Sequence, residues 1–102
     1  MSAPQYLFVF ELDEEAMIST GYTEEDLFSL YKTEIPKTLE CCGFMRMHDT
    51  MYRTNNTEGL LSVMGLQDQM SHNKNFAPYI KYSYIFRVTD WSDILVLINN
   101  KE

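Results

Sequence analysis

The chain has 102 residues, enough for one compact domain (residues 1–102) and too few for two ordinary ones. Apolar residues make up 45% of it, and 15 acidic against 8 basic residues give a formal charge of −7. We therefore expect a packed core, whereas disorder and tight non-specific binding to duplex DNA or an anionic membrane are disfavoured.

The only two cysteines, Cys41 and Cys42, are adjacent. Neither a disulfide framework nor a cysteine-based zinc site is expected from them. No stretch approaches the roughly 18 apolar residues that a membrane span needs, and the first residues lack the features of a signal peptide. These features predict a cytoplasmic protein that does not associate with membranes.

A strand is expected over residues 5–12, whose sequence QYLFVFEL is rich in aromatic and β-branched residues. Alternation places Phe8 and Phe10 on one face and Leu7, Val9 and Glu11 on the other. The three acids that follow, at 13–15, are expected on a solvated loop.

A helix is expected to begin after Thr23, because residues 23–26 (TEED) resemble a capping box with acids in the first turn. Pro36 predicts a kink or break before it, and Gly43 a stop. The apolar positions that continue at helical spacing are Leu27, Leu30, Tyr31, Ile35 and Leu39.

Two short strands are expected over residues 44–47 and 51–54, around a turn at 48–50. Residues 55–57 can cap a second helix whose inward side chains would be Leu60, Leu61, Met64 and Met70. A strand over 80–88 would place Tyr82, Tyr84, Phe86 and Val88 on one face, and the first three are expected in the core. A last helix is expected from Asp90, with Trp91 packed inward.

This order predicts an α+β fold: a ferredoxin-like βαββαβ arrangement with a four-stranded antiparallel sheet and an extra C-terminal helix. One face of such a sheet is left open. Leu7 and Val9 on that face are too apolar for water, so a homodimer through the open face is expected.

Several polar side chains fit RNA chemistry. Glu11 could bind Mg²⁺ or act as a general base on a 2′-hydroxyl, or it could be a surface carboxylate or part of an intersubunit salt bridge. His48 could serve as acid or base, although exposed turn histidines are commoner. The strands also carry cations that could hold phosphates beside Tyr52 and Tyr84 or simply neutralise carboxylates: Arg46, Arg53, Lys81 and Arg87.

Residues 85–98, IFRVTDWSDILVLI, together with Gly43-Phe44, Tyr52 and the opening YLFVFEL, resemble the virulence-associated protein D (VapD) family. The resemblance implies a ferredoxin-like homodimer related to the small nuclease-like CRISPR subunit. It also implies an endoribonuclease, in some members the toxin of a toxin–antitoxin pair. The family's aromatic-Asp-Leu strand end corresponds here to Phe10-Glu11-Leu12.

By the same resemblance, Thr50 and Tyr52 would orient the substrate, Lys81 takes the place of a common Arg, and Arg87 matches. We therefore expect an endoribonuclease that cleaves single-stranded or loop RNA, with an antitoxin or other protein as partner. The alternative is a non-catalytic acidic interaction or inhibitor protein on the same fold, which binds a basic or nucleic-acid-binding protein.

Overall fold

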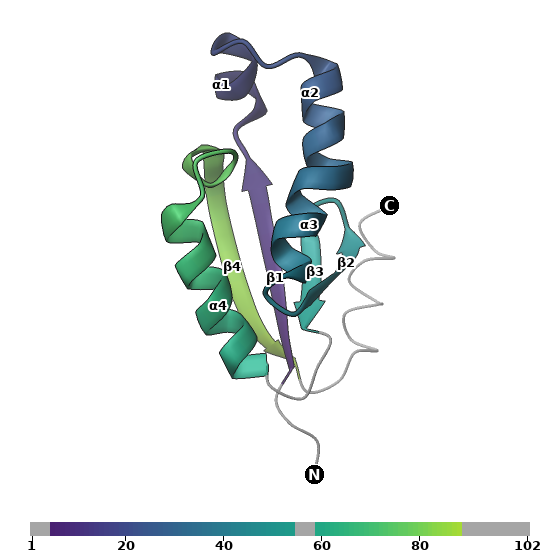
Figure 1. The fold of residues 1–102 in the computed structure, drawn as a ribbon, viewed down its shortest axis with the longest axis vertical. Coiled ribbons are helices and arrows are strands. Elements are labelled where there is room, and N and C mark those ends of the chain that lie inside the picture. The colour runs from purple at the N-terminus through teal and green to yellow at the C-terminus, as the bar shows by residue number, and fades with distance from the viewer. Residues whose placement is uncertain (1–4, 55–58, 89–102) are drawn as a thin grey trace.

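The computed structural model describes residues 5–54 and 59–88 (Figure 1). The cap expected at residues 55–57 and the C-terminal helix expected from Asp90 lie outside the described residues. The elements in chain order are β1 (Gln5–Leu12), α1 (Glu14–Ser19), α2 (Glu24–Ser29), a π-helical turn (Leu30–Glu34), α3 (Ile35–Glu40), β2 (Phe44–His48), β3 (Met51–Thr54), α4 (Gly59–His72), a 3-10 turn (Ala77–Tyr79) and β4 (Ile80–Val88).

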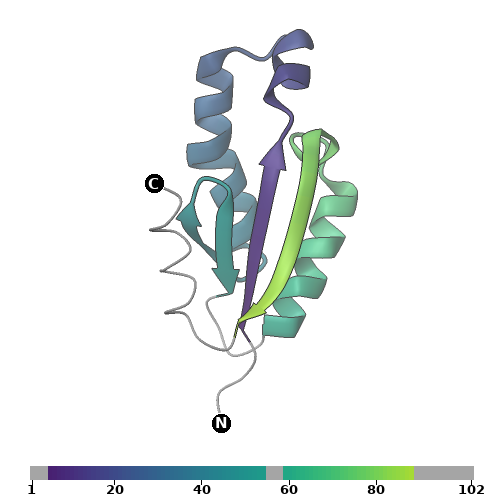
Figure 2. The same ribbon diagram turned by 180° about the vertical axis from the view of Figure 1, so that it is seen from behind.

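The four strands form one antiparallel sheet in the order β2-β3-β1-β4. The helices α3 and α4 lie on one face of it, and the view from behind shows the strands in front of both helices (Figures 1 and 2). The expected α+β class and antiparallel sheet are thus confirmed. We call the face turned away from α3 and α4 the open face.

The core forms where β1 meets the helices. Phe8, Phe10 and Leu12 alternate along β1 on the helix side, and each is no more than 3% exposed. The rings of Phe8 and Phe10 are stacked with centroids 5.2 Å apart. Each such buried side chain stabilises the fold by about 1.5–3 kcal/mol. The predicted faces of this strand are confirmed.

The acids after β1 do not form a loop, contrary to expectation. Asp13 caps helix α1, because its Oδ1 accepts a hydrogen bond of 3.1 Å from the Ala16 N–H. Glu14 and Glu15 occupy the first turn, where carboxylates interact favourably with the helix dipole. Asp13 is a residue type favoured at helix N-caps, so the sequence contained this signal. A run of acids is also typical of a solvated loop, which is why the loop was expected.

The expected capping box at α2 is confirmed. Thr23 Oγ1 accepts from the Asp26 N–H at 3.1 Å, and Asp26 Oδ2 accepts from the Thr23 N–H at 2.9 Å. The backbone hydrogen bond from Thr23 is the main reason why the pKa of Asp26 is lowered from its ordinary value.

Pro36 interrupts the helical hydrogen bonding as expected. The turn before it is π-helical, and the Ile35 N–H donates to the Leu30 carbonyl five residues earlier. Pro36 itself lies in the first turn of α3, where a missing N–H costs little. The helical segment ends at Glu40, and Gly43 then adopts φ of +88°, which suits glycine best.

The inward face of α4 differs from the expectation. Leu60, Leu61 and Met64 are 60%, 58% and 56% exposed, so their predicted burial is wrong. The buried positions are instead Gly59, Ser62 and Leu66, with Val63 and Met70 half-buried against the core. Small residues such as Gly59 and Ser62 permit a close approach to the sheet, which a hydrophobicity pattern does not register.

Candidate functional site

Glu11 lies near the end of β1, on the open face, and is exposed. The Phe10 N–H before it donates to the Thr50 carbonyl at 3.1 Å, which fixes the β2–β3 turn beside this strand end. On the other side Glu11 is the register partner of Tyr82. The pKa of Tyr82 is raised, chiefly because its hydroxyl donates a hydrogen bond to the Glu11 carboxylate. Glu11 is therefore accessible, with a tyrosine beside it.

His48 is the last residue of β2 and is exposed. Its register partner is Met51, which in turn pairs with Val9 on β1. Because paired residues point to the same face, His48 shares the open face with Val9 and therefore with Glu11. Thr50, in the turn that follows, is half-buried. The structure thus brings Glu11, His48 and Thr50 to one end of the sheet.

Tyr52 lies on the other face. It pairs with Phe8, is 0% exposed, and its ring is stacked on that of Phe10 at 6.3 Å. Its hydroxyl is buried with no hydrogen-bond partner among the described residues, and burial raises the pKa of Tyr52 to about 12. A side chain with no exposed surface does not touch RNA, so the expected contact between Tyr52 and a substrate does not fit this position.

The four cations expected to hold phosphate do not converge on one point. Arg46 and Lys32 both bind Asp49, with Lys32 Nζ 3.0 Å from Asp49 Oδ1. These two cations, Arg46 first, lower the pKa of Asp49. The predicted role of Arg46 in phosphate binding therefore competes with an existing ion pair.

The other three expected cations lie elsewhere on the sheet. Arg53 is half-buried and pairs with Leu7, on the open face. Lys81 and Arg87 are exposed near the two ends of β4, and Arg87 pairs with Tyr6. Arg53 therefore shares a face with Glu11, whereas register places Arg87 on the helix side of the sheet.

The aromatic residues of β4 also lie on a different face from the one predicted. Tyr82, Tyr84 and Phe86 were expected in the core but are 45%, 55% and 49% exposed on the open face. Ser83 and Ile85, the intervening residues, face the helices instead. Ser83 at an inward position breaks the apolar pattern of that face, so the row of rings appeared to be the buried one.

The expected reason for a dimer also changes. Leu7, on the open face, is only 4% exposed in the single chain, and Val9 is half-buried. Within the described residues of this face, the largest exposed apolar side chains belong to β4 rather than to β1. The homodimer stays a prediction, and exposure of Leu7 is no longer a reason for it.

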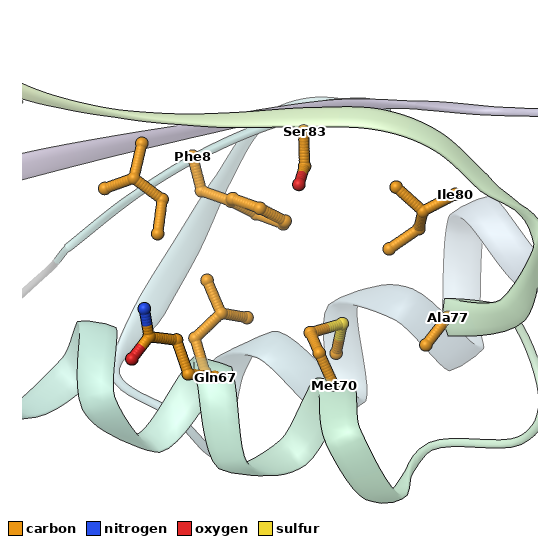
Figure 3. Close-up of a pocket in the computed structure, with 8 residues that line it drawn as sticks. Phe8, Gln67, Met70, Ala77, Ile80 and Ser83 are labelled. Carbon is orange, nitrogen blue, oxygen red and sulfur yellow. The ribbon is translucent and has the colours of Figure 1, made fainter.

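A cavity of about 400 Å³ lies between the sheet and α4 (Figure 3). Phe8 and Ser83 project into it from the sheet, toward Met70 on α4. Its lining contains none of the expected site residues and is mostly apolar: Phe8, Leu66, Gln67, Met70, Ala77, Ile80, Ser83 and Ile85. The cavity is therefore on the opposite side of the sheet from Glu11.

Across residues 5–54 and 59–88, no group of three or more His, Cys, Asp or Glu side chains is positioned to hold a metal ion. Glu11 has no such companions there, so the described residues of one chain do not fit the expected Mg²⁺ site. None of the helices in the described part of the chain is long and apolar enough to cross a membrane.

No protein-family model matches the sequence, and no curated protein matches it either. The resemblance to the VapD family therefore rests on the residues that carry it, in the strands and in the segment 85–98.

Proposed function

We propose that this chain is a VapD-like endoribonuclease with a ferredoxin-like fold, which cleaves single-stranded or loop RNA. Two features support the fold assignment. The described elements follow the order βαββαβ if α1 to α3 are counted as one helical segment, and β1 lies between β3 and β4 with every neighbour antiparallel.

The hydrogen bond between the Phe10 N–H and the Thr50 carbonyl, 3.1 Å long, carries the functional proposal. It attaches the β2–β3 turn to the end of β1, so that an exposed carboxylate, an exposed imidazole and a hydroxyl lie at one end of the sheet. General acid–base cleavage of RNA needs a base for the 2′-hydroxyl and an acid for the leaving oxygen. Glu11 and His48 supply these two groups.

In the proposed reaction the Glu11 carboxylate removes the proton of a ribose 2′-hydroxyl. The 2′-oxygen then bonds to the adjacent phosphorus, and the bond from phosphorus to the 5′-oxygen breaks. Protonated His48 gives its proton to that departing oxygen. The products are a 2′,3′-cyclic phosphate and a 5′-hydroxyl, and in this proposal Thr50 orients the phosphate by hydrogen bonding.

The test compares cleavage of a labelled stem-loop RNA by the wild type, Glu11→Gln and Glu25→Gln. Glu25 is an exposed acid in the first turn of α2 and serves as the matched control. We expect Glu11→Gln to lose at least about 100-fold in rate, as is usual for removal of a general base, and Glu25→Gln to keep the wild-type rate.

A 2′-deoxy nucleotide at the cleaved position should block the reaction, because it removes the attacking oxygen. Equal cleavage by the wild type and Glu11→Gln, or cleavage of the 2′-deoxy substrate, would contradict the proposal. The homodimer and an antitoxin partner remain part of the proposal and are tested by sedimentation and by co-purification.

A second candidate function is a non-catalytic acidic protein that binds a basic partner. The ion pairs of Asp49 favour it, because they occupy Lys32 and Arg46 that RNA would otherwise use. The segments 14–19 and 24–40 also carry seven acidic and only two basic residues. If the wild type cleaves no RNA but binds a polybasic peptide with an affinity that falls steeply with salt, this second function is favoured.

A further inference from the structure

The exposed rings of β4 form a row along the open face. Tyr82, Tyr84 and Phe86 alternate along the strand, so their side chains point the same way. The ring centroids are 5.6 Å apart between Tyr82 and Tyr84 and 6.0 Å apart between Tyr84 and Phe86. Each ring is about half exposed, which leaves aromatic surface free to contact another molecule.

The charges of the chain are segregated in a way that suits a polyanion at the sheet. The described strands carry four of the eight basic residues (Arg46, Arg53, Lys81 and Arg87) and one of the 15 acidic residues, Glu11. The sheet is therefore the basic part of an acidic protein. Phosphate groups would be attracted to the strands and repelled by the helical segments 14–19 and 24–40.

Cations also lie at both ends of the row of rings. Lys81 precedes Tyr82 and Arg87 follows Phe86 on β4, an edge strand of the described sheet, and both are exposed, although register places Arg87 on the helix side of that strand. Arg53 shares the open face with Phe86, on the other side of Leu7, because both residues are register partners of Leu7. Aromatic rings beside cations are the combination that binds single-stranded nucleic acid, with bases on the rings and phosphates at the cations.

A second copy of the chain is a poorer partner for β4 than a single-stranded nucleic acid is. Antiparallel pairing of two β4 strands centred on Tyr84 would set Lys81 of each copy opposite Arg87 of the other. Like charges directly opposite one another destabilise a strand pair, and edge lysines of this kind oppose strand-to-strand association.

We propose that Tyr82, Tyr84 and Phe86 form a stacking track, a row of rings on which unpaired RNA bases stack. This track directs the RNA to Glu11. The inference rests on the proposed function for its substrate. Tyr82, at one end of the row, is the register partner of Glu11, so RNA stacked along β4 passes the proposed base. Bases inside a duplex are already stacked and do not reach the rings, so the track selects single-stranded segments.

The test is direct binding of a fluorescent single-stranded RNA, and of the same sequence as a duplex, measured by anisotropy in a Glu11→Gln background that prevents cleavage. Tyr84→Ser is compared with Phe28→Ser. Phe28 is 66% exposed on α2 and is the matched control, an exposed ring away from the sheet. We expect Tyr84→Ser to weaken single-strand binding at least about fivefold, and Phe28→Ser to leave it unchanged. Duplex binding should be weak and insensitive to both substitutions.

Equal single-strand affinities of Tyr84→Ser and Phe28→Ser would overturn the inference, as would no RNA binding by the parent protein. A change from dimer to monomer in Tyr84→Ser with unaltered RNA affinity would overturn it in favour of a protein contact. Binding that depends on Tyr84, in a protein whose cleavage does not depend on Glu11, would support the track and contradict the proposed chemistry. The two proposals therefore fail separately.

Discussion

Glu11 and Tyr52 lie on opposite faces of the same sheet, because Tyr52 pairs with Phe8 and Glu11 is three residues from Phe8 along β1. The two residues that the VapD resemblance joins in one site are thus separated by the thickness of the sheet. Glu11 is exposed, whereas Tyr52 is fully buried. Different roles follow for them: chemistry for Glu11 and packing for Tyr52.

Tyr52→Phe should leave RNA cleavage unchanged and keep the free energy of unfolding equal or raise it by up to about 1 kcal/mol. The reason is that the substitution keeps the ring and removes a buried hydroxyl that has no hydrogen-bond partner in the described part of the chain. Urea unfolding and the cleavage assay measure the two effects. A large loss of cleavage at unchanged stability would show that the Tyr52 hydroxyl does reach the substrate.

Alkaline pH should destabilise the wild type more than Tyr52→Phe. Burial raises the pKa of Tyr52 from 10.0 to about 12, so its stabilising effect is complete below pH 10 and is lost as pH rises through 12. Over that window one such group costs about 1.4 kcal/mol per pH unit. Urea midpoints measured from pH 9 to 12 should therefore fall less steeply for Tyr52→Phe. Parallel curves would mean that Tyr52 ionises as readily folded as unfolded.

Asp49→Asn should lower the free energy of unfolding at pH 7 by about 0.5 kcal/mol, the range of partly exposed ion pairs. The pKa of Asp49 is lowered by Arg46 and Lys32, so its contribution is present above the ordinary value of 3.8 and is lost as pH falls through the lowered pKa. Thermal melts at pH 7 and pH 2 test this, because the difference from the wild type should be smaller at pH 2 than at pH 7. Asp49→Asn should also bind RNA more tightly, since it releases two cations.

Leu66→Ala and Leu61→Ala test which face of α4 is buried. Leu66 is 1% exposed and lines the cavity, so its truncation should cost about 2–5 kcal/mol. Leu61 is 58% exposed, and the same truncation there should change stability by no more than about 0.5 kcal/mol. Reversed values in chemical unfolding would restore the face expected from the hydrophobicity pattern.

Gly43→Ala and Gly65→Ala should have opposite signs. Gly43 has φ of +88°, so a side chain there should cost about 1 kcal/mol or more. Gly65 lies inside α4, and apart from its chain neighbours and the backbone of α4 no atom of the described residues comes within 4 Å of an added Cβ, so alanine should stabilise the helix by about 0.5–1 kcal/mol. Melting temperatures give the comparison, and a stabilising Gly43→Ala would refute the reading of Gly43 as a conformational stop.

Local signals predicted much of this fold. The capping box at Thr23, the interruption at Pro36 and the faces of β1 are each set within a few residues, and each is confirmed. The predictions of the inward faces of α4 and β4 were wrong, because which face is buried depends on the residues that lie across the core. Alternate residues of β4 form two rows on opposite faces, and the sequence of β4 does not say which row faces the core. Only the register with β1 decides that Ser83 and Ile85 face inward.

The candidate site was predictable in its parts and not in its assembly. Glu11 at an exposed strand end and Thr50 in the hairpin turn follow from the pattern of the sequence. The sharing of Asp49 by Lys32 and Arg46 does not, because it joins the helical segment to the hairpin across 17 residues. The burial of Tyr52 likewise depends on contacts with Phe10 that no local pattern encodes.

The π-helical turn before Pro36 contains one residue more than a regular α-helical turn. It therefore shifts every residue after it by one position around the helix. Leu30 and Ile35 are five residues apart and both buried, although five residues of regular α-helix would leave them about 140° out of phase. In an uninterrupted helix Glu34, four residues after Leu30, would face the core. Related chains can therefore lack one residue within 30–34 and keep the same buried stripe, so sequence alignments should place a single-residue gap there.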